Sequence, residues 1–300
     1  MQTLIVNNQD GSIQGVNANK VNEIPFFLCT NVQDVPNAAP NELDNTLTLN
    51  AFQAYPEIVA MTVSGEGPMK LFALAADRTG AARVKLALAE GDSRRALCNT
   101  SLHIDTIFGN GPQPYPLAEE LYSDELRRLM VELTDISGAT NVIRLVGHCA
   151  RYLSEKTDPG LIICRERQEH KEFLSIPFWY TADKGQIQLL ANQSVQVPVT
   201  INDDAHFSLS QLSAVSTGLF SIDIIDAAKG ESILSAPQGN HYEIDSRLLF
   251  GDNHFPYCFS EPILVQIKQR LVLSITDLSG AANDVDITLH GRAIADRLWK

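Results

Sequence analysis

The sequence lacks the signals that mark several large classes of protein. No apolar run approaches the roughly 20 residues of a membrane-spanning helix, and the N-terminal stretch MQTLIVNNQDGSIQG has neither the basic nor the apolar part of a signal peptide. The five cysteines are odd in number and none forms a C-x-x-C pair, which excludes zinc-ribbon and dithiol redox motifs. We therefore expect reduced thiols in a protein assembled in a cytoplasm.

Basic residues are also in short supply. The chain has 23 Lys and Arg against 36 Asp and Glu, a formal net charge of −13. Phosphate binding requires clustered basic side chains, so this balance disfavours nucleic acid and anionic membranes as direct partners.

Motifs of catalysis and cofactor binding are missing as well. The sequence has no P-loop, no HExxH and no GxGxxG after a strand. Adjacent acids such as Glu119-Glu120 are typical of solvated edges rather than of a glycosidase pair, and Asn202-Asp203-Asp204 is typical of an acidic turn rather than of a calcium loop. We predict no enzyme activity and no catalytic, cofactor-binding or metal site.

Four histidines lie in the second repeat without the spacing of a metal site. None of the four matches a histidine in the first half, so ordinary core or surface roles are expected. They are His206, His241, His254 and His290.

The most informative positive feature is an internal repeat. The segment FGNGPQPYPLAEEL from Phe108 resembles FGDNHFPYCFSEPI from Phe250, and LTDISGATN resembles ITDLSGAAN at the same offset. A constant register of this length indicates a duplication. The other matches are Ile24–Phe27 with Ile176–Trp179, Thr79-Gly80 with Thr217-Gly218 and, after a two-residue slip, Gly147 with Gly291.

The repeat divides the chain into four parts. Residues 1–23 are an N-terminal arm, 24–153 are the first repeat, 154–175 are a charged linker and 176–300 are the second repeat. The linker opens on Asp158-Pro159-Gly160, a turn signature, and we expect a short helix over residues 164–174. The arm contains the strand-like Leu4-Ile5-Val6, which is suited to adding a strand to a neighbour.

Each repeat is predicted to consist of β-strands. Segments such as 83–88, 220–224 and 285–290 alternate between apolar and polar residues, as strands with one buried face do. Pro198 in the alternating segment 195–201 predicts an edge strand. The one helical turn expected within the repeats lies at Leu117–Leu121.

Strand number and spacing predict the fold class. It is all-β, with two tandem antiparallel β-sandwich domains of jelly-roll type. An immunoglobulin-like sandwich is the alternative, although its Cys…Trp…Cys spacing is missing.

The shared SGA-x-N block lies between two predicted strands and indicates a hairpin loop. We predict that Ser137 and Ser279 occupy equivalent loops and act structurally, because no GxSxG elbow surrounds either serine. The aromatic residues Phe178-Trp179-Tyr180 are expected to face the core of their own repeat. Tyr115 and Tyr257 are expected to pack over a sandwich end, with a ligand surface as the alternative.

The later half of each repeat follows one pattern, seen in PYPLAEEL…LMVELTDISGATNVIRLVG and PYCFSEPI…LVLSITDLSGAANDVDITLHG. It resembles tailed-bacteriophage virion structural proteins with tandem jelly-roll domains, of the capsid-decoration or neck-collar type. The resemblance implies a non-enzymatic virion protein that binds copies of itself and other virion proteins of the capsid, portal, neck or tail. It carries over no functional residues. The alternatives are a carbohydrate- or receptor-binding module and a double jelly-roll major capsid protein.

Overall fold

The computed structural model describes residues 23–29, 46–51, 56–62, 69–90, 93–109, 113–123, 127–152, 173–234, 242–251 and 255–296. The predicted arm and linker lie almost wholly outside these ranges, so the predicted domain limits stay predictions. The same is true of the expected helix over 164–174, except that its last two positions belong to strand β11.

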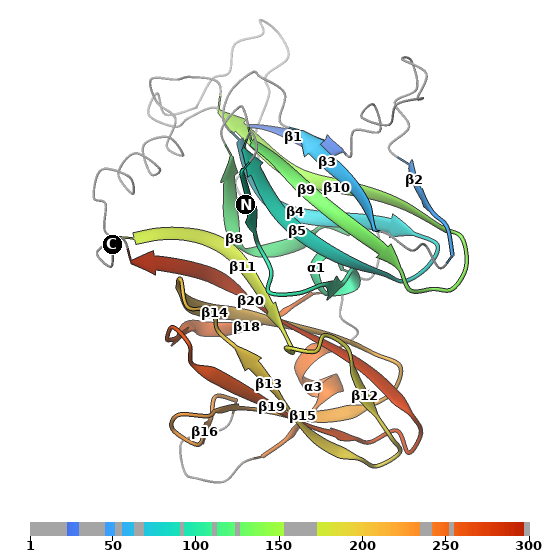
Figure 1. Ribbon diagram of the computed structural model, residues 1–300, viewed down its shortest axis with the longest axis vertical. Helices are drawn as coiled ribbons and strands as arrows, with labels where there is room; N and C mark the ends of the chain where they lie inside the picture. Colours follow the sequence, from blue (N-terminus) through green and yellow to red (C-terminus); the bar gives the residue numbers. More distant parts are fainter. Residues whose placement is uncertain are drawn as a thin grey trace, which may run out of the picture.

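The described residues form two β-sandwiches, one above the other in Figure 1. Sandwich one contains β1 (Glu23–Cys29), β2 (Thr46–Leu49), β3 (Glu57–Thr62), β4 (Met69–Arg78), β5 (Ala82–Glu90), β6 (Ser93–Ala96), β7 (Leu102–His103), α1 (Asp105–Phe108), β8 (Tyr115–Ser123), β9 (Arg127–Asp135) and β10 (Asn141–Tyr152). Sandwich two contains β11 (Phe173–Thr181), β12 (Ile187–Leu189), β13 (Ser194–Thr200), β14 (His206–Ser216), β15 (Phe220–Asp226), β16 (Glu231–Ser232), β17 (Ile244–Asp245), α3 (Ser246–Phe250), β18 (Tyr257–Val265), β19 (Arg270–Asp277) and β20 (Asn283–Asp296).

Both sandwiches have the same strand order. In sandwich one the first sheet runs β1-β10-β4-β8 with β2 beside β10, and the second runs β3-β9-β5-β6 with β7 beside β5. In sandwich two the orders are β11-β20-β14-β18 with β12, and β13-β19-β15-β16 with β17. The chain crosses repeatedly between the two sheets, which is the jelly-roll arrangement and not the immunoglobulin one. The predicted fold class is confirmed in both halves.

Each sandwich encloses its own hydrophobic core. The core follows from the alternation of apolar and polar residues along the strands. In β19, Leu271, Leu273 and Ile275 are buried, and the residues between them point outward. Pro198 lies in β13, which is at the edge of its sheet as predicted.

The short helices do not lie where the sequence was expected to place one. Residues Leu117–Leu121 belong to strand β8, so the predicted helical turn is wrong. The helix α1 lies just before β8, and α3 lies just before β18, the counterpart of β8 in sandwich two. The helices end at Phe108 and Phe250, and each is followed by a glycine with positive φ, 78° at Gly109 and 59° at Gly251. The Phe-Gly repeat therefore marks the end of a helix, which glycine permits.

The repeated loop closes through its own polar side chains. In sandwich two the Ser279 hydroxyl and the Gly280 amide both donate to the Asp277 carboxylate, at 2.7 and 3.0 Å. The Asn283 amide group accepts from the Gly218 backbone N–H at 2.8 Å and donates to the Leu219 carbonyl at 3.1 Å. These bonds hold the β14–β15 turn against the β19–β20 loop.

Sandwich one repeats this arrangement atom for atom. The Ser137 hydroxyl donates to Asp135 at 2.7 Å, the Gly138 amide donates to Asp135 at 3.1 Å, and the Gly80 amide donates to Asn141 at 2.8 Å. A Cβ on Gly80 would lie 2.7 Å from the Ser137 Cβ, and the same value holds between Gly218 and Ser279. The prediction of equivalent loops is confirmed, and the close approach explains why Thr-Gly is part of the repeat.

Strand register corrects one part of the alignment. From the repeated loop onward the two ladders run in step, so that His148 pairs with Ala73 where His290 pairs with Gln211. His148 is therefore the counterpart of His290, and Cys149 is the counterpart of Gly291. Both the two-residue slip and the statement that His290 has no matching histidine are wrong.

The loop asparagines are expected to be important for stability. We predict that Asn141→Ala and Asn283→Ala each lower the free energy of unfolding by about 1–3 kcal/mol, because each leaves a partly buried backbone N–H and C=O without their partner. The exposed Asn202 provides a matched control. Urea unfolding measures the effect, and an equal loss in Asn202→Ala would contradict the role of the loop.

Candidate functional site

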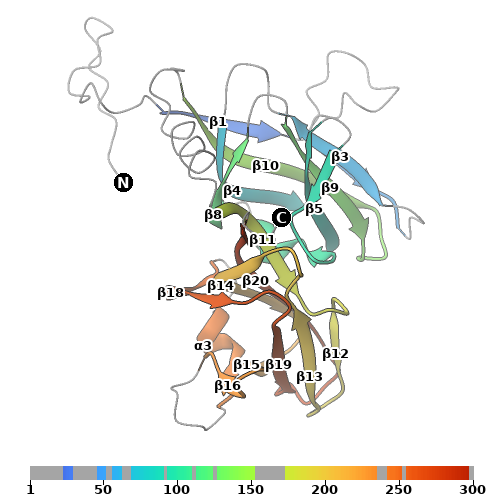
Figure 2. The same ribbon diagram turned by 60° about the vertical axis from the view of Figure 1, so that its left-hand side comes forward.

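The two sandwiches meet along a continuous seam. On sandwich one the seam is formed by β8, α1 and β7, and on sandwich two by β11, β14 and β20. Figures 1 and 2 both show β8 next to β11 at this contact. We call this contact the seam and treat it as the candidate functional site, because it contains a group of buried polar and charged side chains.

Trp179 crosses the seam. It belongs to β11, yet its side chain is 2% exposed and packs in the hydrophobic core of sandwich one, while Phe178 and Tyr180 pack in sandwich two. The expectation that all three face their own core is therefore wrong for Trp179. Its backbone N–H donates to the Leu97 carbonyl at 2.9 Å, and its carbonyl accepts from the Asn99 N–H at 3.2 Å.

A buried chain of hydroxyl groups continues the seam beside the tryptophan. Thr288 of β20 donates to the Thr106 hydroxyl at 2.7 Å, and Thr106 donates to the His103 carbonyl at 2.8 Å. The Ser213 hydroxyl of β14 donates to the Thr106 carbonyl at 2.9 Å. Thr106 is fully buried, so these bonds replace water that the group loses on folding.

Ser213 also lies 2.7 Å from Nε2 of the buried His290, a distance seen in nucleophile–base pairs. The Trp179 indole N–H donates to Nδ1 of His290 at 3.1 Å, so Nδ1 carries no proton and Nε2 must carry it. The Nε2–H then donates to Ser213, whose own hydrogen is given to Thr106. His290 therefore cannot accept the proton of Ser213, and the arrangement is a structural clamp rather than a catalytic dyad.

Burial fixes the charge state of this clamp. Desolvation lowers the pKa of His290 to about 3, and burial also lowers the pKa of His103. Burial raises the pKa of Tyr115, whose ring centroid lies 6.1 Å from that of His290. All three groups are thus neutral near pH 7.

Two ion pairs border the neutral groups. Arg83 of β5 pairs with Asp286 of β20 across the seam, with Nη1 and Oδ1 at 2.7 Å and both side chains nearly buried. Arg78 pairs with Asp105 within sandwich one, with Nε and Oδ1 at 2.6 Å. Two positive and two negative groups balance, which limits the electrostatic cost of their burial.

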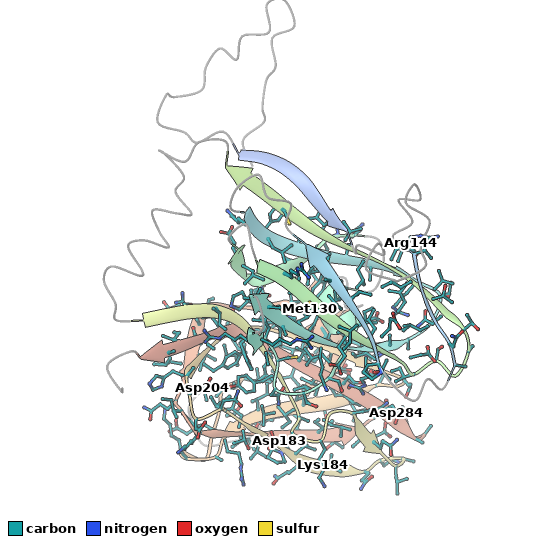
Figure 3. The ribbon with its side chains drawn as sticks, turned by 45° about the horizontal axis from the view of Figure 1, so that its top comes forward. Met130, Arg144, Asp183, Lys184, Asp204 and Asp284 are labelled. Atoms are coloured by element: carbon teal, nitrogen blue, oxygen red, sulfur yellow. The ribbon has the colours of Figure 1, made fainter. Side chains whose placement is uncertain are left out.

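The residues singled out in the sequence mostly lie elsewhere. Ser137 and Ser279 are in exposed loops, and Asp203 and Asp204 are exposed at the outer edge of sandwich two, where Figure 3 labels Asp204. No three His, Cys, Asp or Glu side chains of the described residues gather in a way that could hold a metal ion. No helix in the described part of the chain is long and apolar enough to cross a membrane.

The repeated tyrosines have unequal surroundings. They open β8 and β18 at the same register, opposite Leu74 and Leu212 respectively. Tyr115 is 1% exposed because it lies in the seam, whereas Tyr257 is 36% exposed. Neither lies in a loop at a sandwich end, so that expectation is wrong.

Sequence reasoning missed Trp179, Ser213 and Thr106 as seam residues. One signal was available: the repeat aligns Trp179 with Phe27, and an indole in place of a phenyl ring adds an N–H that requires a partner when buried. The partner, His290, comes from the far end of the chain, and only the fold brings the two together.

Comparison with known proteins gives no family assignment. No known protein family matches the sequence, and no curated protein matches it. Among solved structures, the major capsid protein P2 of bacteriophage PM2 aligns with a TM-score of 0.38 at 8% identity, covering 91% of this chain and 99% of that one. The STIV major capsid protein aligns at 0.33 and 9%, covering 82% and 96%. Peptide:N-glycanase F aligns at 0.29 and 9%, covering 84% and 96%. Scores this low carry no argument about function.

The seam is expected to make the two sandwiches unfold as one unit. We predict a single calorimetric transition for the wild type and a loss of about 3–5 kcal/mol in Trp179→Ala, the usual range for truncating a buried large aromatic residue. Trp179→Ala should also split the transition in two. Phe207→Ala, a buried truncation inside sandwich two, is the control and should keep one transition. Two transitions in the wild type would contradict the coupling.

Acid is expected to weaken the seam. The pKa of folded His290 is about 3, below its ordinary value of 6.5, so the unfolded chain binds the extra proton first. The contribution of neutral His290 to stability is therefore complete above pH 6.5 and is lost as the pH decreases towards 3. Melting temperatures between pH 7 and 4.5 test this: His290→Gln should flatten the dependence, and an unchanged slope would contradict it.

Proposed function

We propose that this protein is a structural component of a virus particle that works through contacts with copies of itself and with other particle proteins. The seam is the single observation that carries the proposal. It joins two complete jelly rolls through a buried tryptophan, a hydroxyl chain and an ion pair, which favours a rigid building block over two independently moving modules. Jelly rolls recur in viral capsid proteins and in lectins.

The nature of the contact within the seam supports an assembly role. Sandwich one contributes β8, α1 and β7, whereas sandwich two contributes β11, β14 and β20, the counterparts of β1, β4 and β10. Two different surfaces of one repeated fold are therefore complementary. Contacts of this heterologous kind generate rings or extended arrays when they recur between subunits.

Within this role we favour the shell-forming alternative, a double jelly-roll major capsid protein. Both repeats keep the full strand order, and a fused pair of equal blocks is suited to tiling a surface. Tailed-phage decoration and the neck or collar are the narrower locations that the sequence resemblance implies. Location in the virion after assembly in a host cytoplasm is part of the proposal.

The carbohydrate- or receptor-binding alternative depended on two loop tyrosines. Tyr115 is buried in the seam and therefore unavailable to a ligand. No observation on the described residues favours this alternative over assembly.

Light scattering combined with electron microscopy of the purified full chain tests the proposal. The expected result is a concentration-dependent rise in mass from the 33.0 kDa chain to a defined oligomer, and ordered arrays or shells at high concentration. A protein that remains monomeric at all concentrations and binds no viral particle protein would contradict the structural role.

A further inference from the structure

The face of sandwich one that is covered in the seam has an uncovered counterpart on sandwich two. Thr106 lies two residues before the Phe-Gly end of α1, and Leu248 lies at the same place in α3. Thr106 is 0% exposed, whereas Leu248 is 83% exposed. Together with Tyr257, the exposed counterpart of Tyr115, Leu248 makes this face apolar where water should reach it.

The side chains that contact Thr106 in the seam also have apolar counterparts in the other sandwich. In the seam Thr106 bonds to Ser213 and Thr288, which lie directly opposite each other on β14 and β20. Their counterparts in sandwich one are Ala75 and Val146, directly opposite each other on β4 and β10. The seam brings together three hydroxyl side chains. The same contact made between the equivalent positions would bring together a leucine, an alanine and a valine. The replacement of all three makes these positions apolar, as the core of a protein–protein interface is.

The positions equivalent to the Arg83–Asp286 ion pair of the seam also have complementary charges, with the positive and negative groups on opposite faces from those in the seam. The counterparts of Arg83 and Asp286 are Ser221 and Arg144, as the strand registers show. Ser221 donates a hydrogen bond of 2.5 Å to Glu243, so a carboxylate stands near the place of the arginine. Arg144, whose side chain is 52% exposed and which also pairs with Asp77, stands in the place of the aspartate. Figure 3 shows Arg144 at the outer edge of sandwich one.

We propose that the free face, formed by Leu248, Tyr257 and Glu243, docks onto the receiving face of a second copy of this chain. The receiving face is formed by Ala75, which is 7% exposed, by the partly buried Val146 and by the exposed Arg144. The contact has the geometry of the seam, repeated between chains instead of within one. This inference rests on the proposed self-assembly and names its surface. Because the two faces differ, each copy offers one of each, and the contact is heterologous.

Two surface variants and their mixture test the proposal. Leu248→Asp removes the free face and leaves the receiving face intact, and Val146→Asp does the reverse. Each variant alone is expected to self-associate at least tenfold more weakly than the wild type in sedimentation experiments. An equimolar mixture should form a heterodimer of twice the 33.0 kDa chain mass and nothing larger, since only one pair of intact faces remains.

Controls separate docking from folding and from surface charge in general. Leu190→Asp introduces the same charge at a 70% exposed leucine of the β12–β13 turn and should associate like the wild type. If Val146→Asp fails to fold, Arg144→Glu takes its place. Its loss of association should be restored when Glu243→Lys is present in the same chain.

Wild-type-like association of Leu248→Asp, or a mixture that stays monomeric, would overturn the docking surface while leaving the proposed structural role intact. A wild type that never associates would overturn both. The two failures are therefore distinguishable in one set of experiments.

Discussion

The burial of one indole ring in the neighbouring sandwich is the interaction on which the architecture depends. Trp179 leaves its own core and enters that of sandwich one, and its N–H fixes the tautomer of His290. That tautomer in turn sets the direction of the bond to Ser213 and, through it, to Thr106. A buried polar chain of this kind is stable only when each member is satisfied, so its directions are determined together.

The same chain explains why a serine and a histidine in close contact do not indicate catalysis here. In a nucleophile–base pair the base must be free to accept the hydroxyl proton. His290 presents a donor to Ser213, because its acceptor nitrogen is occupied by the tryptophan. The distance between Ser213 and His290 alone would suggest a reactive pair. The positions of the protons show that the pair has a structural role.

Much of the fold could be predicted from the sequence because the duplication samples it twice. Strand alternation, the edge position of Pro198 and the equivalence of Ser137 and Ser279 follow from local patterns that recur. The seam could not be predicted, because Trp179, Thr106 and His290 come from distant segments and differ between the repeats at the positions that matter. The helical turn was misplaced because the Phe-Gly signal marks the end of a helix upstream.

The two repeats differ most at the face that is buried in the seam in sandwich one and exposed in sandwich two. The central claim is that this exposed face binds a second copy of the chain. Electron cryomicroscopy of the self-assembled protein tests it most directly. The account predicts that α3 and β18 of one copy lie against β4 and β10 of the next, with Leu248 beside Val146. An assembly in which α3 and β18 face solvent, or meet the same face of another copy, would contradict it.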